Sequence, residues 1–139
     1  MLMPMPFVRA SVVAALLMSQ TPARAADDPS KTVIDAAVTF SVGYGGWLWE
    51  KHCKTLPPAK GREFDALVQD VLKRLQEASD PTLFNAAVGA GRSVSSDPKY
   101  AGCDGKDTKG FAQFGLDQVR DADAKLKTLP AGFHLKIKD

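Results

Sequence analysis

The sequence predicts an all-α fold, a small four-helix, bundle-like domain held by one disulfide and followed by a short extended tail. Aspartate-proline pairs, which are typical of helix starts, occur at Asp28-Pro29, Asp80-Pro81 and Asp97-Pro98. Runs of Val, Ile and Thr that alternate with polar residues, as strands require, are scarce. An apolar leader indicates export to an oxidising compartment, where the two cysteines, Cys53 and Cys103, are expected to pair.

The leader, residues 1–25, has the composition of a removable secretion signal. A start with one positive charge is followed by an apolar run over residues 10–18, and residues 23–25 (Ala-Arg-Ala) match the small-x-small pattern that signal peptidase recognises. The apolar run is far shorter than the ~20 residues that a membrane-spanning helix needs. We therefore expect cleavage between Ala25 and Ala26, which leaves a single periplasmic (or secreted) domain over residues 26–139.

The charge of this domain argues against two classes of partner. The whole chain has 18 Lys and Arg against 16 Asp and Glu, and Arg9 and Arg24 of the leader account for the excess. A formally neutral domain with interspersed signs lacks the basic surface typical of nucleic-acid binding and the polybasic patch that binds anionic membranes. We therefore expect no nucleic-acid binding. Because no second long apolar run follows the leader, we also expect no membrane insertion.

The first two helices are predicted from their apolar spacing. The first is expected from Ser30 to Lys54, and its glycines at 43, 45 and 46 are expected to bend or break it, since each costs about 1 kcal/mol in a helix interior. The segment Leu56-Pro57-Pro58 separates it from the second helix. That second helix has the clearest amphipathic pattern in the chain, with an apolar face made of Phe64, Leu67, Val68, Val71, Leu72, Leu75 and Ala78.

The third and fourth helices complete the predicted bundle. The third follows Asp80-Pro81 and is rich in alanine and glycine, which suits close packing against a bulky partner such as the Trp47/Trp49 region. The fourth is expected from Thr108 to Leu129, where Pro130 ends it. A disulfide between Cys53, at the end of the first helix, and Cys103, just before the fourth, is then expected to join the ends of the bundle.

The C-terminal tail alternates apolar and polar residues, which is typical of extended backbone. Phe133, Leu135 and Ile137 share one face of this pattern. The chain offers no evident partner strand. We therefore expect the tail either to pack across its own bundle or to add a strand to the sheet edge of a partner.

No motif predicts catalysis, a cofactor or a metal site. Adjacent residues on a helix point ~100° apart, so His52 and Cys53 do not form a favourable ligand or catalytic pair. The segment from Asp104 to Asp107 lacks the alternating acids and the final glutamate of a calcium loop. There is no Cys-x-x-Cys, phosphate-binding glycine loop or nucleophile elbow. We therefore expect a protein that is not an enzyme and holds no cofactor.

An aromatic patch provides the candidate binding surface. Trp47 falls on the predicted buried stripe of the first helix, whereas Trp49 lies off it. Because aromatic residues dominate interface hot spots, Tyr44 and Trp49, together with the tail residues Phe133 to Ile137, are the residues expected to contact a partner. Core packing of both tryptophans is the alternative.

The arrangement of these features resembles that of the acid-stress chaperones of the bacterial periplasm, which are small, exported and helical with one disulfide. The resemblance lies in a tryptophan shortly before His52-Cys53, about fifty residues to Cys103, and a charged closing helix. Small helical immunity proteins that neutralise secreted toxins share these general features. The hypothesis is a non-enzymatic module that binds another protein, in a chaperone-like or inhibitor-like role. The alternatives are a small-molecule or metal carrier, with a pocket between the third helix and the Trp47/Trp49 region, and a small enzyme without a recognisable motif.

Overall fold

The computed structural model describes residues 28–137, so the predicted leader and its cleavage site lie outside the described range. In chain order the elements are α2 (Pro29–Cys53), α3 (Pro58–Ala78), α4 (Pro81–Ser95), the 3-10 turns η1 (Pro98–Tyr100) and η2 (Lys106–Thr108), and α5 (Phe111–Lys127). No strand occurs among these residues, and the predicted all-α, bundle-like fold is confirmed.

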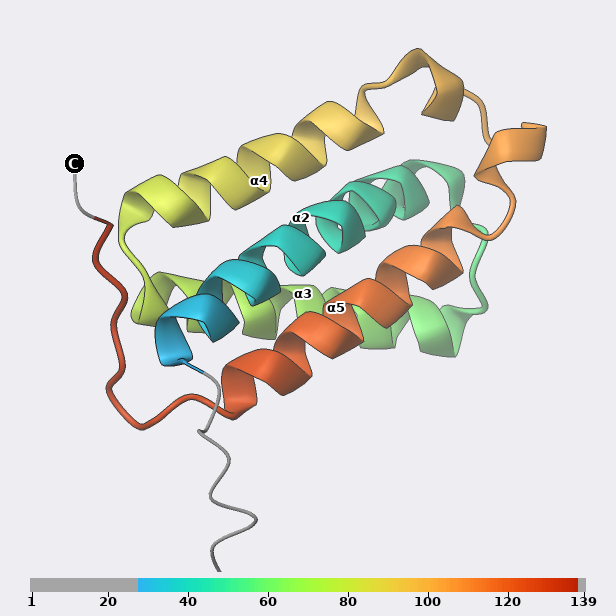
Figure 1. The fold of residues 1–139 in the computed structure, drawn as a ribbon. Helices are drawn as coiled ribbons and strands as arrows, with labels where there is room; N and C mark the ends of the chain where they lie inside the picture. Colours follow the sequence, from blue (N-terminus) through green and yellow to red (C-terminus); the bar gives the residue numbers. More distant parts are fainter. Residues whose placement is uncertain (1–27, 138–139) are drawn as a thin grey trace, which may run out of the picture.

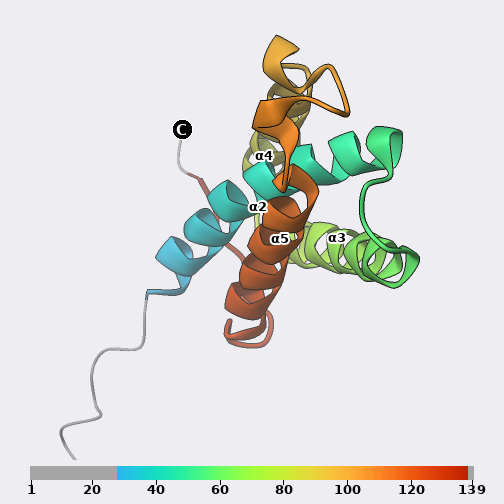
Figure 2. The same cartoon turned by 90° about the vertical axis from the view of Figure 1, so that its right-hand side faces the viewer.

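Helix α2 is the centre of the bundle. Figure 1 shows α2 between α4 on one side and α3 and α5 on the other, and the end view in Figure 2 shows the same order. Its side chains are therefore buried on more than one face, from Val33 and Phe40 near the start to Trp49 near the end. A single apolar stripe is a poor description of such a helix, because a stripe assumes one buried face.

Three glycines allow α4 and α5 to cross α2 closely. A Cβ at Gly43 would lie 2.9 Å from the backbone oxygen of Gly115 in α5, and a Cβ at Gly46 would lie 3.0 Å from the Cα of Gly115. On the other side of α2, a Cβ at Gly45 would lie 2.9 Å from the backbone oxygen of Gly91 in α4. The glycines do not break the helix, because α2 is continuous through this segment. Packing on both sides offsets the intrinsic cost of glycine in a helix.

The small residues of α4 face a different partner from the one predicted. A Cβ at Gly91 would lie 2.6 Å from Cδ1 of Tyr44 and 2.8 Å from the backbone oxygen of Ser41. The close neighbour of Gly91 is thus the middle of α2, while Val94, near the end of α4, packs against the cluster that contains Trp49. Gly89, by contrast, faces open space.

Local capping explains some helix starts but not all of them. Asp28 accepts a hydrogen bond from the Ser30 amide (3.0 Å), and Asp97 accepts one from the Lys99 amide (3.0 Å), as aspartate before proline predicts. Asp80 makes no such cap, because its carboxylate binds the C-terminal tail instead. Helix α5 begins at Phe111, later than predicted, because Gly110 adopts a positive φ of 81°.

The predicted disulfide is present. Cys53, the last residue of α2, is bonded to Cys103 with a Cα–Cα distance of 5.4 Å. Beside this bond lies a second apolar cluster, in which Trp49 packs edge-on against Phe111 and Tyr100 stacks on Phe111 at 4.2 Å between ring centroids. The disulfide and this cluster together fix the connection between α4 and α5 to the end of α2.

The C-terminal strap, which we define as residues 130–137, packs on its own bundle. In Figure 1 it runs from the end of α5 past the junction of α3 and α4. The Leu135 amide donates to the Ala78 carbonyl (2.7 Å), and the Asp80 amide donates to the Leu135 carbonyl (3.2 Å). Of the two expectations for the tail, the structure therefore shows intramolecular packing, and its partner is the short connection between two helices.

Candidate functional site

The predicted binding surface on α2 is buried. Tyr44 is only 8% exposed and Trp49 only 5%. Both rings pack in the core, because α4 covers the side of α2 that bears Tyr44 and the Phe111 cluster covers Trp49. In the strap, Phe133 and Leu135 are half-buried against the core, and Ile137 is 41% exposed.

Trp47 is the tryptophan that reaches the surface. Its half-buried ring is fixed by Asp65 of α3, whose Oδ1 accepts a hydrogen bond from Trp47 Nε1 at 2.8 Å. Lys51 lies 2.9 Å from the same carboxylate and 4.9 Å from the centroid of the Trp47 ring. The hydrogen bond from Lys51, followed by that from Trp47, holds the pKa of Asp65 below its usual value.

These side chains border a cavity of about 460 Å³ between the C-terminal half of α2 and the start of α3, which we call the Trp47 cleft. Its volume lies within the range typical of ligand pockets. Its lining combines apolar and charged groups: Trp47, Glu50, Lys51, Lys54, Leu56, Pro58, Gly61, Phe64 and Asp65. Local sequence patterns do not predict this site because it depends on a contact between Trp47 and Asp65, which lie 18 residues apart.

Glu50 gives the cleft a fixed edge. This buried carboxylate accepts three hydrogen bonds from the connection between α2 and α3: from the Thr55 amide (2.9 Å), the Thr55 hydroxyl (2.7 Å) and the Leu56 amide (2.8 Å). Lys54, the residue just after α2, has a positive φ of 52° and donates its amide to the Glu50 carbonyl. Glu50 is therefore a structural group that positions Leu56 and not a free acid or base.

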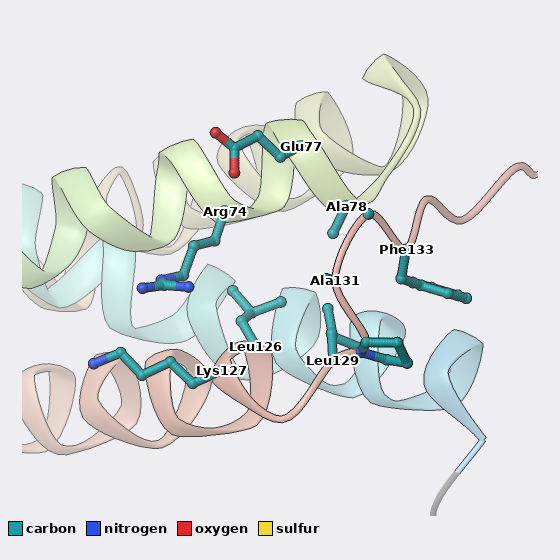
Figure 3. A pocket seen from close by; sticks show the side chains of 10 residues that line it. Arg74, Glu77, Ala78, Leu126, Lys127, Leu129, Ala131 and Phe133 are labelled. Carbon is teal, nitrogen blue, oxygen red and sulfur yellow. The ribbon is translucent and has the colours of Figure 1, made fainter.

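A second cavity, of about 440 Å³, lies between the ends of α3 and α5 and the strap. Figure 3 shows the cationic ends of Arg74 and Lys127 on one side of it and the apolar Leu126 and Phe133 toward the other. Both cations are already paired: Arg74 Nε lies 3.0 Å from Asp70, and Lys127 Nζ lies 2.7 Å from Asp123. The two cations at this cavity are thus already paired with carboxylates of the protein.

Asp123 is the buried acid of this network. It is 4% exposed, and burial, together with the neighbouring Asp70 carboxyl, raises its pKa above the usual value. The pKa of Asp70 is lowered, chiefly by its hydrogen bond with Asp123. Because Arg74 of α3 and Lys127 of α5 both contact Asp123, the network links these two helices.

The remaining candidates from the sequence do not form a site. His52 is exposed on α2, while the sulfur of its neighbour Cys53 is in the disulfide. Among the side chains that the structure describes, no three His, Cys, Asp or Glu gather in a way that would hold a metal ion. Within residues 28–137, no helix combines the length and apolar character needed to cross a membrane.

Comparison with known proteins gives no match: neither a family model, nor a curated protein, nor a solved structure is significantly similar to this chain. The geometry of the Trp47 cleft is therefore the basis for assigning a function.

Proposed function

We propose that this chain is a non-enzymatic, exported binding protein, and that the Trp47 cleft is where it holds part of another protein. The observation that supports this proposal is the cleft itself, in which a half-exposed tryptophan stands beside the apolar Leu56 and Phe64 and the charged rim residue Lys54. Aromatic anchors of this kind dominate the binding energy of protein interfaces.

The cleft is also held in place before any partner binds. Asp65 and Lys51 orient the Trp47 ring, and Glu50 fixes the connection that contains Leu56. The disulfide at Cys53 ties down the end of α2. A site that is ordered in advance loses less conformational entropy when it binds, which favours affinity.

Site-specific photocrosslinking in the exported protein tests this proposal. A photoreactive residue at Lys54, on the rim of the cleft, is expected to give a partner adduct, whereas one at Lys73, exposed on α3 and away from the cleft, is not. Gly61→Phe is expected to abolish the Lys54 adduct by filling the cleft. Gly61→Ala is the matched control that leaves it intact, because no atom lies within 4 Å of a Cβ at Gly61. An adduct that survives Gly61→Phe, or that forms equally from Lys73, contradicts the proposal.

Acid titration distinguishes the two versions of this function. A stress chaperone is expected to lose structure and bind a hydrophobic dye between pH 7 and pH 2, whereas an inhibitor of one partner is expected to remain folded. The lowered pKa values of Asp65 and Asp80 favour acid destabilisation, since both carboxylates must be protonated at low pH. Circular dichroism with dye fluorescence measures both outcomes. A bound small molecule or metal found by native mass spectrometry would instead support a carrier.

A further inference from the structure

We infer that the Trp47 cleft selects an acidic segment of its partner, in which an apolar side chain enters the cleft and an adjacent carboxylate meets Lys54. This inference rests on the proposed function and adds the chemistry of the partner to it. Three properties of the cleft support it: its carboxylates are engaged, its neighbouring cations are not paired, and its floor is apolar.

The carboxylates at the cleft are all engaged within the protein. Both oxygens of Glu50 accept hydrogen bonds from Thr55 and Leu56. Asp65 binds Lys51 and Trp47. Because their oxygens already accept hydrogen bonds from the protein, these carboxylates are less available to a cation on a partner.

Lys51 is paired with Asp65, but Lys54, the other cation that lines the cleft, and two cations next to it in sequence are in the opposite situation. Across the described part of the chain, Lys54, Lys60 and Arg62 lie beyond salt-bridge distance of every carboxylate. Lys54 lines the cleft, and Lys60 and Arg62 flank Gly61 in sequence. Lys60 Nζ instead contacts the neutral amide of Gln113, at 2.9 Å. A partner with negative charge complements this excess of unpaired positive charge.

The floor of the cleft requires an apolar group beside that negative charge. The half-buried Trp47 and Leu56 provide apolar walls, and no atom lies within 4 Å of a Cβ at Gly61, at the start of α3. Lys51 does not compete for the incoming carboxylate, since Asp65 already holds its ammonium group. A phenylalanine or leucine next to an aspartate or glutamate would place an apolar side chain against these walls and a carboxylate beside Lys54 at the rim.

NMR titration with three short peptides tests the inference. The probe is an acetylated, amidated Gly-Gly-Phe-Glu-Gly-Gly, and its counterparts replace Glu with Gln or Phe with Ala. The two tryptophan indole signals report separately, because Trp47 Nε1 donates to Asp65 while Trp49 Nε1 is buried without a partner. The Phe-Glu peptide is expected to shift the Trp47 signal and leave that of Trp49 unchanged. The Phe-Gln peptide is expected to bind about two- to fivefold more weakly, as loss of an exposed ion pair implies. The Ala-Glu peptide is expected to bind still more weakly.

Variants of the protein give a matched set of controls. Lys54→Asn is expected to reduce the preference for Phe-Glu over Phe-Gln to near unity, and asparagine tolerates the positive φ of this position. Lys73→Asn removes a charge from the exposed face of α3 and is expected to leave the preference intact. Two results would overturn the acidic preference: equal binding of the Phe-Glu and Phe-Gln peptides, or an equal change in that preference in Lys54→Asn and Lys73→Asn. Either result would still leave a cleft that binds apolar groups. If no peptide shifts the Trp47 signal at millimolar concentration, the inference fails, and the crosslinking experiment still decides the proposed function.

Discussion

Gly43→Ala is expected to destabilise the protein, although alanine is the better helix former. The substitution removes the intrinsic cost of glycine, a gain of about 1 kcal/mol. Against this gain, the new Cβ would lie 2.5 Å from Cγ2 of Val119 and 2.9 Å from the backbone oxygen of Gly115. The side chain of Val119 can rotate, but the carbonyl belongs to the backbone of α5, so the two helices must move apart. Overpacking of this kind costs about 1–3 kcal/mol, and the contact with backbone places this site at the upper end. We expect a net loss of about 1–2 kcal/mol.

Gly89→Ala is the matched control. Gly89 lies inside α4, and no atom lies within 4 Å of a Cβ at this position. The same substitution is therefore expected to stabilise the protein by about 0.5–1 kcal/mol. Urea unfolding with the disulfide intact measures both variants. If the slope of the unfolding free energy against urea concentration is unchanged, the variants differ from the wild type in stability and not in the compactness of the folded or unfolded state. If Gly43→Ala is as stable as Gly89→Ala, the close crossing of α2 and α5 is wrong.

Three further predictions concern the disulfide, the edge of the cleft and the strap. Replacing both Cys53 and Cys103 by alanine is expected to lower the free energy of unfolding by about 4 kcal/mol for a loop with a sequence separation of 50, and urea unfolding of the oxidised and substituted proteins checks this. Glu50→Ala is expected to cost about 1–3 kcal/mol, because three donors lose their charged acceptor; hydrogen exchange at the connection between α2 and α3 should also accelerate. Asp80 raises the pKa of His134 above 6.5, so the contribution of this pair is fully present below pH 6.5 and is lost as the pH rises through the raised value. His134 in turn lowers the pKa of Asp80 below 3.8, so the contribution is also lost as the pH falls through that lowered value. The thermal stability of the wild type relative to His134→Gln should therefore decline from pH 6 to pH 9. If the melting temperatures of the two proteins change in parallel with pH, the His134–Asp80 pair does not contribute as stated.

Local sequence signals predicted the helices well where one face is buried. Helix α3 follows its apolar pattern, and Phe64, Val68, Val71 and Leu75 of that face are fully buried. Helix α2 was harder because α4 and α5 pack on different sides of it, so no single stripe describes its buried residues. Local propensity predicts that these glycines break the helix. In the folded chain they are the points where α2 lies close to the backbones of α4 and α5.

The candidate site was predicted poorly because its geometry depends on tertiary contacts. Spacing alone places Trp47 on the buried stripe of the first helix and Trp49 off it. In the structure Phe111 covers Trp49, whereas Asp65 holds Trp47 at the edge of a cavity. The role of Asp80 was difficult to predict for the same reason. Its position before proline predicts a helix cap, but its carboxylate instead binds His134, 54 residues away.

The glycine contacts also affect how distant homologues of this chain can be recognised. A helix that meets its neighbours through bare backbone tolerates few larger residues at those points, while the outer surfaces of α3 and α5 are free to diverge. Related proteins should therefore keep small residues at the positions equivalent to 43, 45, 46, 91 and 115 even where their overall sequence identity to this chain is low. A search pattern built on these positions and the two bonded cysteines should detect such relatives better than one that weights every position equally.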